Sequence, residues 1–314
     1  MVILTDRDRY FLEILRENGM ITYKQAGQLY ETSSYHFKRL KQLIEGGYIK
    51  KNGRKYVTLG TTGVKELELN IKTNYKFQKR ILEKPETEKR EVSVDLMLLC
   101  SKYNCRWFYS RMAKLQFNIS KNISINGLIS CQNKNYPVYI LSKYPLKTKI
   151  RQMQKEIPWL KIFDGIIVLC LTQEIYDAFN ISINNNRAPA HLYLLEYPAN
   201  IDLALSILNS EIMDNIYKTI LKIDELLPTS KVYADKMVRR NNKEYYLTNL
   251  LINDLARLNY IKEYIDKWYK LEQRPIIVIH RENQNFFLSG EGVKTLAISD
   301  NQLGEIIQYK QTNI

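Results

Sequence analysis

Residues 22 to 59 contain the pattern that most restricts the fold, because two short helical signals are followed directly by a hairpin signal. Thr22 to Tyr30 is predicted to be a short helix, opened by Thr22 and Gln25 as a capping box. A turn at residues 31–33 leads into a second predicted helix, Ser34 to Glu45. This order predicts a helix-turn-helix.

A hairpin is predicted immediately after the second helix, at Tyr48 to Leu59. Asn52-Gly53 is a strong signal for a two-residue type I′ turn, in which both central residues need positive φ. Four basic residues flank the turn: Lys50, Lys51, Arg54 and Lys55. A capped helix at residues 5–18 precedes this region, and a fourth helix is expected to end at residue 69. We therefore predict a winged helix-turn-helix domain over residues 1–69.

The second helix of the pair is amphipathic. At 100° per residue, Phe37, Leu40, Leu43 and Ile44 form one apolar stripe, and polar side chains occupy the opposite side. Helices with such a polar face contact base edges and phosphates in the major groove, and a basic hairpin binds the DNA backbone by charge. The predicted DNA-binding residues are Ser34, Tyr35, Lys38, Arg39, Gln42, Lys50, Lys51, Arg54 and Lys55.

The net charge of the chain, +14 with a pI near 9.4, also favours a polyanionic partner. Residues 1–60 alone hold 11 Lys and Arg against 6 Asp and Glu. The chain is rich in Lys, Asn, Ile and Tyr as well, a pattern typical of A+T-rich genomes. Codon usage is therefore an alternative explanation for part of the lysine excess.

The cysteines and histidines predict neither a metal site nor a cofactor. The four cysteines form no CxxC pair, and the three histidines lie far apart in sequence, so we expect reduced, mostly buried thiols. The longest apolar run, Gly165 to Leu171, is predicted to be a strand that is buried on both faces if its neighbours are parallel, and it is shorter than the ~20 residues that span a bilayer. No membrane partner is expected, and a cytoplasmic location follows by default.

The remaining residues predict an α/β fold, with α+β character over the whole chain. Residues 70–90 are lysine-rich and are predicted to be a basic linker. Strand and helix signals alternate over residues 91–210, which indicates a small α/β sandwich. Residues 211–314 are predicted to be a mainly helical extension with added strands, and the clearest helical spacing runs from Tyr246 to Trp268.

Three segments carry a resemblance to a known family: LTDRDRYFLEIL, MITYKQAGQLY and FKRLKQLIEGGYIKK. With the basic linker and the α/β region that follow, the chain resembles the replication-relaxation family of plasmids and conjugative elements over roughly residues 5–200. The resemblance implies that Glu91 to Leu171 adopts a restriction-endonuclease-like, PD-(D/E)XK core. Abortive-infection antitoxins with an N-terminal winged helix are similar over the first 60 residues.

The nuclease motif of that core is degenerate in this sequence. It needs one carboxylate after the first core strand and an acid-x-Lys on the next, because the acids hold Mg²⁺. The first position falls on Asn126 and the second on Leu141-Ser142-Lys143, so both carboxylates are missing. We therefore expect a domain that does not cleave DNA.

These observations lead to one hypothesis and two alternatives. We expect a non-enzymatic, sequence-specific protein that binds double-stranded DNA and belongs to a mobile genetic element. It would act in plasmid or phage replication, in the relaxosome during conjugation, or in transcription control. A homodimer is expected, with other replication or relaxosome proteins as further partners. The alternatives are a Mg²⁺-dependent nuclease, for which Asp164 would be the first carboxylate to suspect, and an antitoxin-like protein-interaction module.

Overall fold

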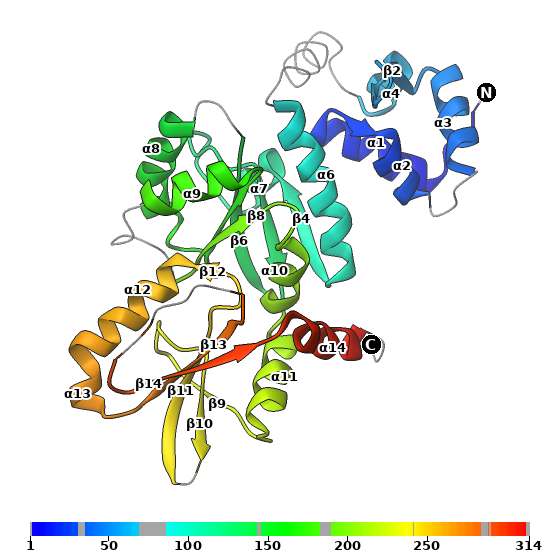
Figure 1. Cartoon of the computed structure of the whole chain (residues 1–314). Helices are drawn as coiled ribbons and strands as arrows, with labels where there is room; N and C mark the ends of the chain where they lie inside the picture. The colour runs from blue at the N-terminus through cyan, green and yellow to red at the C-terminus, as the bar shows by residue number, and fades with distance from the viewer. Residues whose placement is uncertain are drawn as a thin grey trace. The chain divides into compact units, whose positions relative to one another are not determined.

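The structure is a computed structural model that describes residues 2–30, 35–68, 86–142, 146–182, 190–240, 242–283, 288 and 290–311 (Figure 1). It is a mixed α/β protein with open sheets, as the sequence predicts. The chain divides into two compact units, and the boundary passes through strands near residues 105 and 129. The first unit holds residues 1–102, 106–129 and 142–145, and the second holds the others.

The first unit begins with three helices and a small sheet, in the order α1, β1, α2, α3, β2, β3. Its elements are α1 (Asp6–Asn18), β1 (Ile21–Thr22), α2 (Tyr23–Leu29), α3 (Tyr35–Glu45), β2 (Ile49–Asn52), β3 (Tyr56–Leu59), α4 (Thr61–Glu66), α6 (Glu86–Lys102) and α7 (Ser110–Gln116). The strand order is β1-β3-β2, and α6 packs against α1, α2 and β1. In Figure 1, α3 lies on the side of this group away from α6.

Both predicted capping boxes are present. The Thr5 hydroxyl accepts from the Asp8 amide, and the Asp8 carboxylate accepts from the Thr5 amide. Thr22 and Gln25 make the same reciprocal pair at the start of α2. These contacts satisfy amides that would otherwise lack partners at the first turn of each helix, so a local sequence pattern fixes both starting points.

The hairpin turn differs from the sequence prediction. Asn52 pairs with Tyr56 in the antiparallel ladder, so the loop has three residues and begins at Gly53. Gly53 has φ +63°, whereas Asn52 belongs to the strand. A two-residue type I′ turn at Asn52-Gly53 is therefore wrong, because only one of the two residues takes the left-handed conformation.

A six-stranded sheet has the order β12-β8-β7-β6-β5-β4. The strands are β4 (Cys105–Tyr109), β5 (Gly127–Cys131), β6 (Lys134–Leu141), β7 (Ile166–Cys170), β8 (Leu192–Glu196) and β12 (Asn253–Asp254); the accompanying helices are α8 (Leu146–Glu156), η1 (Ile157–Leu160) and α9 (Gln173–Ser182). β6, β7 and β8 are parallel to one another. All five residues of β7 are buried, as its continuous apolar run predicts.

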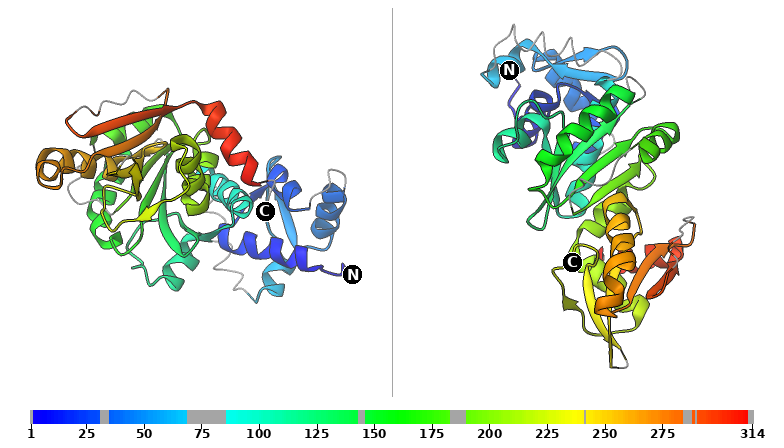
Figure 2. Two further views of the ribbon diagram at one scale, coloured as in Figure 1. Left: turned by 90° about the horizontal axis from the view of Figure 1, so that it is seen from below. Right: turned by 90° about the vertical axis from the view of Figure 1, so that its left-hand side faces the viewer.

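The C-terminal region holds a five-stranded sheet, β14-β13-β11-β10-β9. Its elements are α10 (Ile201–Leu208), α11 (Ser210–Leu221), β9 (Leu227–Pro228), β10 (Lys236–Arg240), β11 (Lys243–Asn249), α12 (Leu255–Glu263), the π-helix η3 (Tyr264–Trp268), α13 (Tyr269–Glu272), β13 (Ile276–Arg281), β14 (Val293–Ile298) and α14 (Asp300–Gln311). One face packs on α12 and η3, and α11 and α14 lie together on the other side (Figures 1 and 2).

Two sequence assignments change in these regions. Residues 246–249 are the end of β11, and the predicted helix at Tyr246 to Trp268 begins only at Leu255. The Asp254 carboxylate accepts from the Arg257 amide and marks the true helix start. Residues 86–90, assigned to the linker, form the beginning of α6, while residues 69–85 lie outside the described residues.

The cysteines are buried as expected, but two of them are paired. Cys105 and Cys131, on the neighbouring strands β4 and β5, form a disulfide with a Cα–Cα separation of 4.4 Å. Cys100 and Cys170 are free and buried. The expectation of four reduced thiols is thus wrong for this pair, because strand neighbours 26 residues apart in sequence are brought together only by the sheet. Within the described residues, no helix is both long and apolar enough to cross a bilayer.

Gly127 allows β5 to approach Trp107 closely, which gives a first testable prediction. A Cβ atom at this position would lie 2.3 Å from Trp107 Cζ2 and 2.7 Å from the Phe108 carbonyl oxygen. We expect Gly127→Ala to reduce the free energy of unfolding by about 1–3 kcal/mol, measured by urea denaturation. The control is Gly304→Ala in α14, where a Cβ would meet nothing within 4 Å and alanine should stabilise the helix. Equal effects from the two substitutions would contradict this account.

Candidate nucleic-acid interface

The outward face of α3 carries aromatic and basic side chains. Tyr35 is 48 % exposed, Lys38 and Lys41 are exposed, and Gln42 is half-buried. Phe37 is also exposed, at 61 %, although the sequence pattern assigns it to the apolar stripe. The stripe is correct for Leu40 and Leu43, which are buried. Ser34 lies outside the described residues.

Arg39 does not belong to this outward face, which corrects the sequence prediction. Its side chain is buried, and Nε donates to Asp8 Oδ1 over 3.0 Å. One terminal nitrogen contacts Asp8 Oδ2 and the Ile3 carbonyl oxygen, and the other donates to Gln42 Oε1 over 3.0 Å. A guanidinium whose donors are used in this way cannot read a guanine without breaking a buried ion pair. We therefore assign Arg39 to holding α3 on α1.

Asp8 is held as a carboxylate by this arrangement. Burial raises its pKa, but hydrogen bonds from Arg39, Thr5 and Tyr30 outweigh burial and lower the pKa to about 2. Because the folded-state pKa lies below the ordinary value of 3.8, the stability that Asp8 contributes is present above that value. It is lost as the pH falls toward 2.

All four cations of the β2–β3 hairpin are exposed, and one of them forms an ion pair with a carboxylate. Lys50, Lys51 and Arg54 are exposed. Lys55 is exposed too, but its Nζ lies 2.7 Å from a carboxylate oxygen of Glu91 in α6, and this hydrogen bond raises its pKa. Tyr56 donates to the same carboxylate. Lys55 therefore tethers the hairpin to α6, and the predicted DNA contact by this residue would compete with that ion pair.

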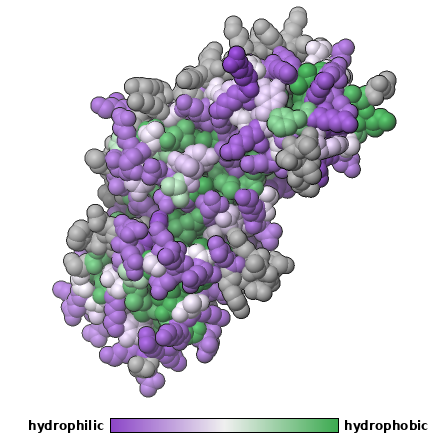
Figure 3. Space-filling model, turned by 45° about the vertical axis from the view of Figure 1, so that its right-hand side comes forward, coloured by the Kyte–Doolittle hydropathy of each residue, from purple (hydrophilic) through white to green (hydrophobic). Residues whose placement is uncertain are grey.

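The surface of the N-terminal region is largely hydrophilic in the upper part of Figure 3, and hydrophobic groups interrupt it. Among residues 2–30 and 35–45, the large exposed apolar side chains are Ile3, Tyr10, Tyr35 and Phe37. Two of these four belong to the first turn of α3. The same helix thus presents aromatic rings and lysines together, the combination that contacts bases and phosphates.

The described residues contain no group of three or more Asp, Glu, His or Cys side chains that could hold a metal ion. Asp164, the carboxylate suspected first, accepts from the Asn135 amide over 2.8 Å and so lies at the start of β6. Leu141, where the acid-x-Lys motif should begin, is at the other end of that strand. Six residues of strand separate the two by about 20 Å, so Asp164 does not join this motif. Lys143 lies outside the described residues.

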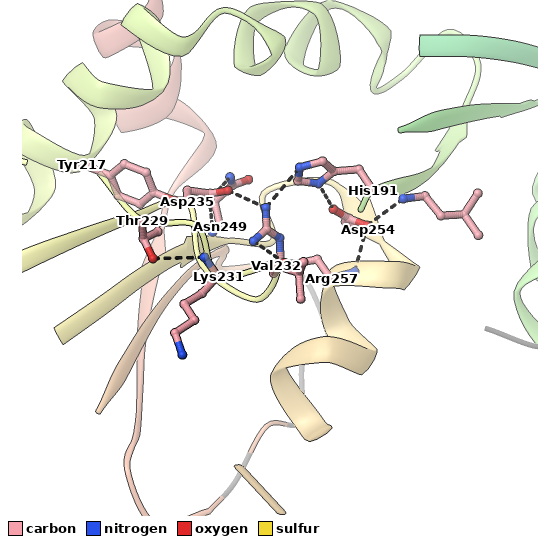
Figure 4. A network of polar contacts seen from close by, with 10 residues as sticks. His191, Tyr217, Thr229, Lys231, Val232, Asp235, Asn249, Asp254 and Arg257 are labelled. Carbon is pink, nitrogen blue, oxygen red and sulfur yellow. Dashed lines mark hydrogen bonds and ion pairs between the residues drawn. The ribbon is translucent and has the colours of Figure 1, made fainter. Parts of the chain in front are cut away.

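A buried polar network joins His191 to α12 in the second unit (Figure 4). His191 Nδ1 lies 2.7 Å from Asp254 Oδ2, and its Nε2 lies 3.1 Å from an Arg257 terminal nitrogen. Arg257 also donates to Asp235 Oδ1 over 2.7 Å and to the Val232 carbonyl oxygen. Sequence reasoning missed this network, whose only local signal is the Asp254 cap at the start of α12.

The network is built for structure rather than for acid–base chemistry. A guanidinium group donates hydrogen bonds and cannot accept them. The contact between Arg257 and His191 is therefore a hydrogen bond that His191 Nε2 accepts, and His191 Nδ1 donates to Asp254. The histidine nitrogen that would act as a base is therefore occupied. Burial raises the pKa of Asp235 and of Asp254, but Arg257 and His191 outweigh burial and hold both below their usual value.

A separate cavity of about 540 Å³ opens on the five-stranded sheet. It is lined by Leu221, Arg240, Tyr245, Ile277, Lys294, Thr295 and Leu296. Ile277 and Lys294 lie near the amino ends of β13 and β14, whereas ligands of open α/β sheets bind at the carboxyl ends. Lys294 Nζ is 4.9 Å from the centre of the Tyr245 ring, a contact that stabilises the cation within the sheet.

Comparisons with protein-family models, with curated proteins and with solved structures found no match to this chain.

Proposed function

We propose that this protein binds double-stranded DNA through α3 and the β2–β3 hairpin and does so sequence-specifically, without cleaving it. The observation that carries the proposal is the exposure of Lys38, Lys50, Lys51 and Arg54 on a helix and hairpin that follow one another directly. The element order α1, β1, α2, α3, β2, β3 supports a winged helix. In that fold the second helix of the pair enters the major groove, and the hairpin holds the backbone.

The contacts divide into two groups by their chemistry. Tyr35, Lys38 and Gln42 lie on the outward side of α3 and would contact base edges and nearby phosphates, together with Lys41, which the sequence prediction omitted. The hairpin cations would bind phosphates by charge alone. Arg39 and Lys55, which the sequence analysis also predicted to bind DNA, are left out of these groups because each donates a hydrogen bond to a carboxylate.

The process served is proposed from the resemblance alone. Its three N-terminal segments favour replication, conjugative transfer or transcription control in a mobile element. A homodimer is proposed with it, because many winged helices bind two half-sites. Nuclease activity is disfavoured because the first motif position is Asn126 and Asp164 lies at the wrong end of β6.

The test begins with selection of bound duplexes from random DNA, with and without Mg²⁺. We expect one recovered motif and no cut ends. The triple substitution Lys50→Ala, Lys51→Ala and Arg54→Ala should weaken binding to all duplexes alike. Each lost phosphate contact reduces the slope of log affinity against log salt by ~0.9, so the slope should fall by about 3.

The matched control removes three exposed lysines from the second unit: Lys218, Lys262 and Lys270. This variant changes net charge by the same amount and should leave the salt slope unchanged. Equal slopes in the two variants would show that binding is unspecific attraction to a basic protein. If no sequence is enriched and no DNA binding is detected even at low salt, the result would favour a protein-interaction module instead.

A further inference from the structure

The outward side of α8 and η1 forms a second surface with unusual chemistry. Lys147, Arg151, Lys155 and Trp159 follow at four-residue intervals, which places them on one side of the helix, and all are exposed. Trp159 is 75 % exposed, and Ile162 just beyond it is 80 % exposed. The inward side packs in the core through Ile150, Met153, Ile157 and Leu160.

This surface is rich in cations. Residues 146–162 contain five lysines and arginines and a single carboxylate, Glu156. Glu156 is buried, and its Oε2 accepts from the Tyr139 hydroxyl over 2.7 Å. Among the described residues, no carboxylate pairs with Lys147, Arg151 or Lys155. Cations four residues apart on a helix are separated by about 6 Å along its axis, close to the spacing of neighbouring phosphates on one strand.

The exposed ring of Trp159 indicates which class of polyanion this surface would bind. Large aromatic side chains are usually mostly buried, and Trp159, at 75 %, is more exposed than Trp107 at 7 % and Trp268 at 49 %. An aromatic ring at the end of a row of cations fits a strand whose bases are free to stack. A membrane surface fits less well, because the apolar stripe of α8 packs inside the protein and, among the side chains that the structure describes here, leaves Trp159 and Ile162 to insert.

We propose that the α8–η1 surface binds single-stranded DNA. Lys147, Arg151 and Lys155 contact successive phosphates, and Trp159 stacks on a base near one end of the bound segment. Stacking accepts any base, so this contact adds affinity for unpaired DNA without adding sequence preference. The surface is built from other elements than α3 and the hairpin, and the inference does not depend on duplex binding by those elements.

The experiment measures binding of a fluorescein-labelled dT15 strand to the full chain by anisotropy. Trp159→Ala should weaken binding by roughly 5- to 150-fold, as loss of one base–aromatic stack does. Trp159→Phe should recover most of that loss, because phenylalanine also stacks. The triple substitution Lys147→Ala, Arg151→Ala and Lys155→Ala should lower the salt slope by about 2, since each phosphate contact on a single strand contributes ~0.7.

Two controls separate this site from the duplex site and from a membrane site. The Lys50, Lys51 and Arg54 triple variant should bind dT15 as the wild type does. Vesicles of phosphatidylglycerol should not shift the tryptophan emission. Unchanged dT15 affinity in both α8–η1 variants would overturn the proposal. An emission shift with vesicles and none with dT15 would overturn it in favour of a membrane surface.

Discussion

Arg39→Ala is expected to lower the free energy of unfolding of the N-terminal region by about 3–5 kcal/mol. The substitution leaves the Asp8 carboxylate, which is fully buried, without its strongest partner. Removing one member of a buried ion pair costs far more than removing an exposed cation, because the remaining charge stays out of water. Urea denaturation gives the magnitude, and hydrogen exchange of the α1 and α3 amides shows where the structure opens.

The neighbouring residue provides the matched control. Lys38 is exposed, so Lys38→Ala should change the unfolding free energy by no more than about 0.5 kcal/mol while weakening DNA binding. The double variant Asp8→Leu, Arg39→Met should be less destabilised than Arg39→Ala, because no unpaired charge is left. If Arg39→Ala unfolds at the wild-type urea concentration but loses discrimination between DNA sequences, Arg39 reads bases and our correction is wrong.

Arg257→Ala should be at least as costly to the second unit, by about 3–5 kcal/mol at neutral pH. Arg257 is 4 % exposed and neutralises Asp235, while its contact with His191 completes the hydrogen bonding of Asp254. Its removal leaves the buried Asp254 and the partly exposed Asp235 with His191 but without a guanidinium group. Arg239→Ala is the control, because its ion pair with Glu244 lies at the surface and should contribute little to stability.

The pH dependence of the Arg257→Ala variant gives an independent measurement. In the wild type, the lowered pKa values of Asp235 and Asp254 mean that their contribution is present above about pH 4 and is lost below it. Without Arg257, less positive charge opposes the effect of burial, so the pKa values of Asp235 and Asp254 rise. Protonation of these carboxylates as the pH falls then removes part of the destabilisation of the variant. The destabilisation measured at pH 5 should therefore be smaller than at pH 7. Equal destabilisation at both values would mean that the buried charges are not its cause.

Local patterns in the sequence predicted the N-terminal elements well. The capping boxes at Thr5 and Thr22 fix two helix starts through contacts only three residues apart. Arg39 shows the limit of such reasoning. A helical wheel assigns it to the polar side of α3, but its partner Asp8 lies 31 residues away and is reached only after α1 and α3 pack. A helical wheel gives only the side of the helix from which a side chain starts. The long side chain of Arg39 then bends inward and reaches Asp8.

The second unit was harder to predict for the same physical reason. Leu247, Leu250 and Leu251 have helical spacing, yet Leu247 pairs with Ile277 in a parallel ladder that the spacing does not reveal. His191 and Arg257 are 66 residues apart and meet only when β8 and α12 come together. The β7 strand was correctly predicted because burial on both faces leaves a signal within the strand itself.

The anchoring of α3 has a consequence for how the specificity of such a protein can change. Arg39, Leu40 and Leu43 hold the helix from behind, while Tyr35 and Lys38 project from it. Because the buried residues and the projecting residues of α3 are different residues, substitutions at the projecting positions should not unfold the helix. If α3 binds duplex DNA as we propose, a library at these positions is a route to new target sequences, because the buried anchor stays constant while the projecting side chains vary.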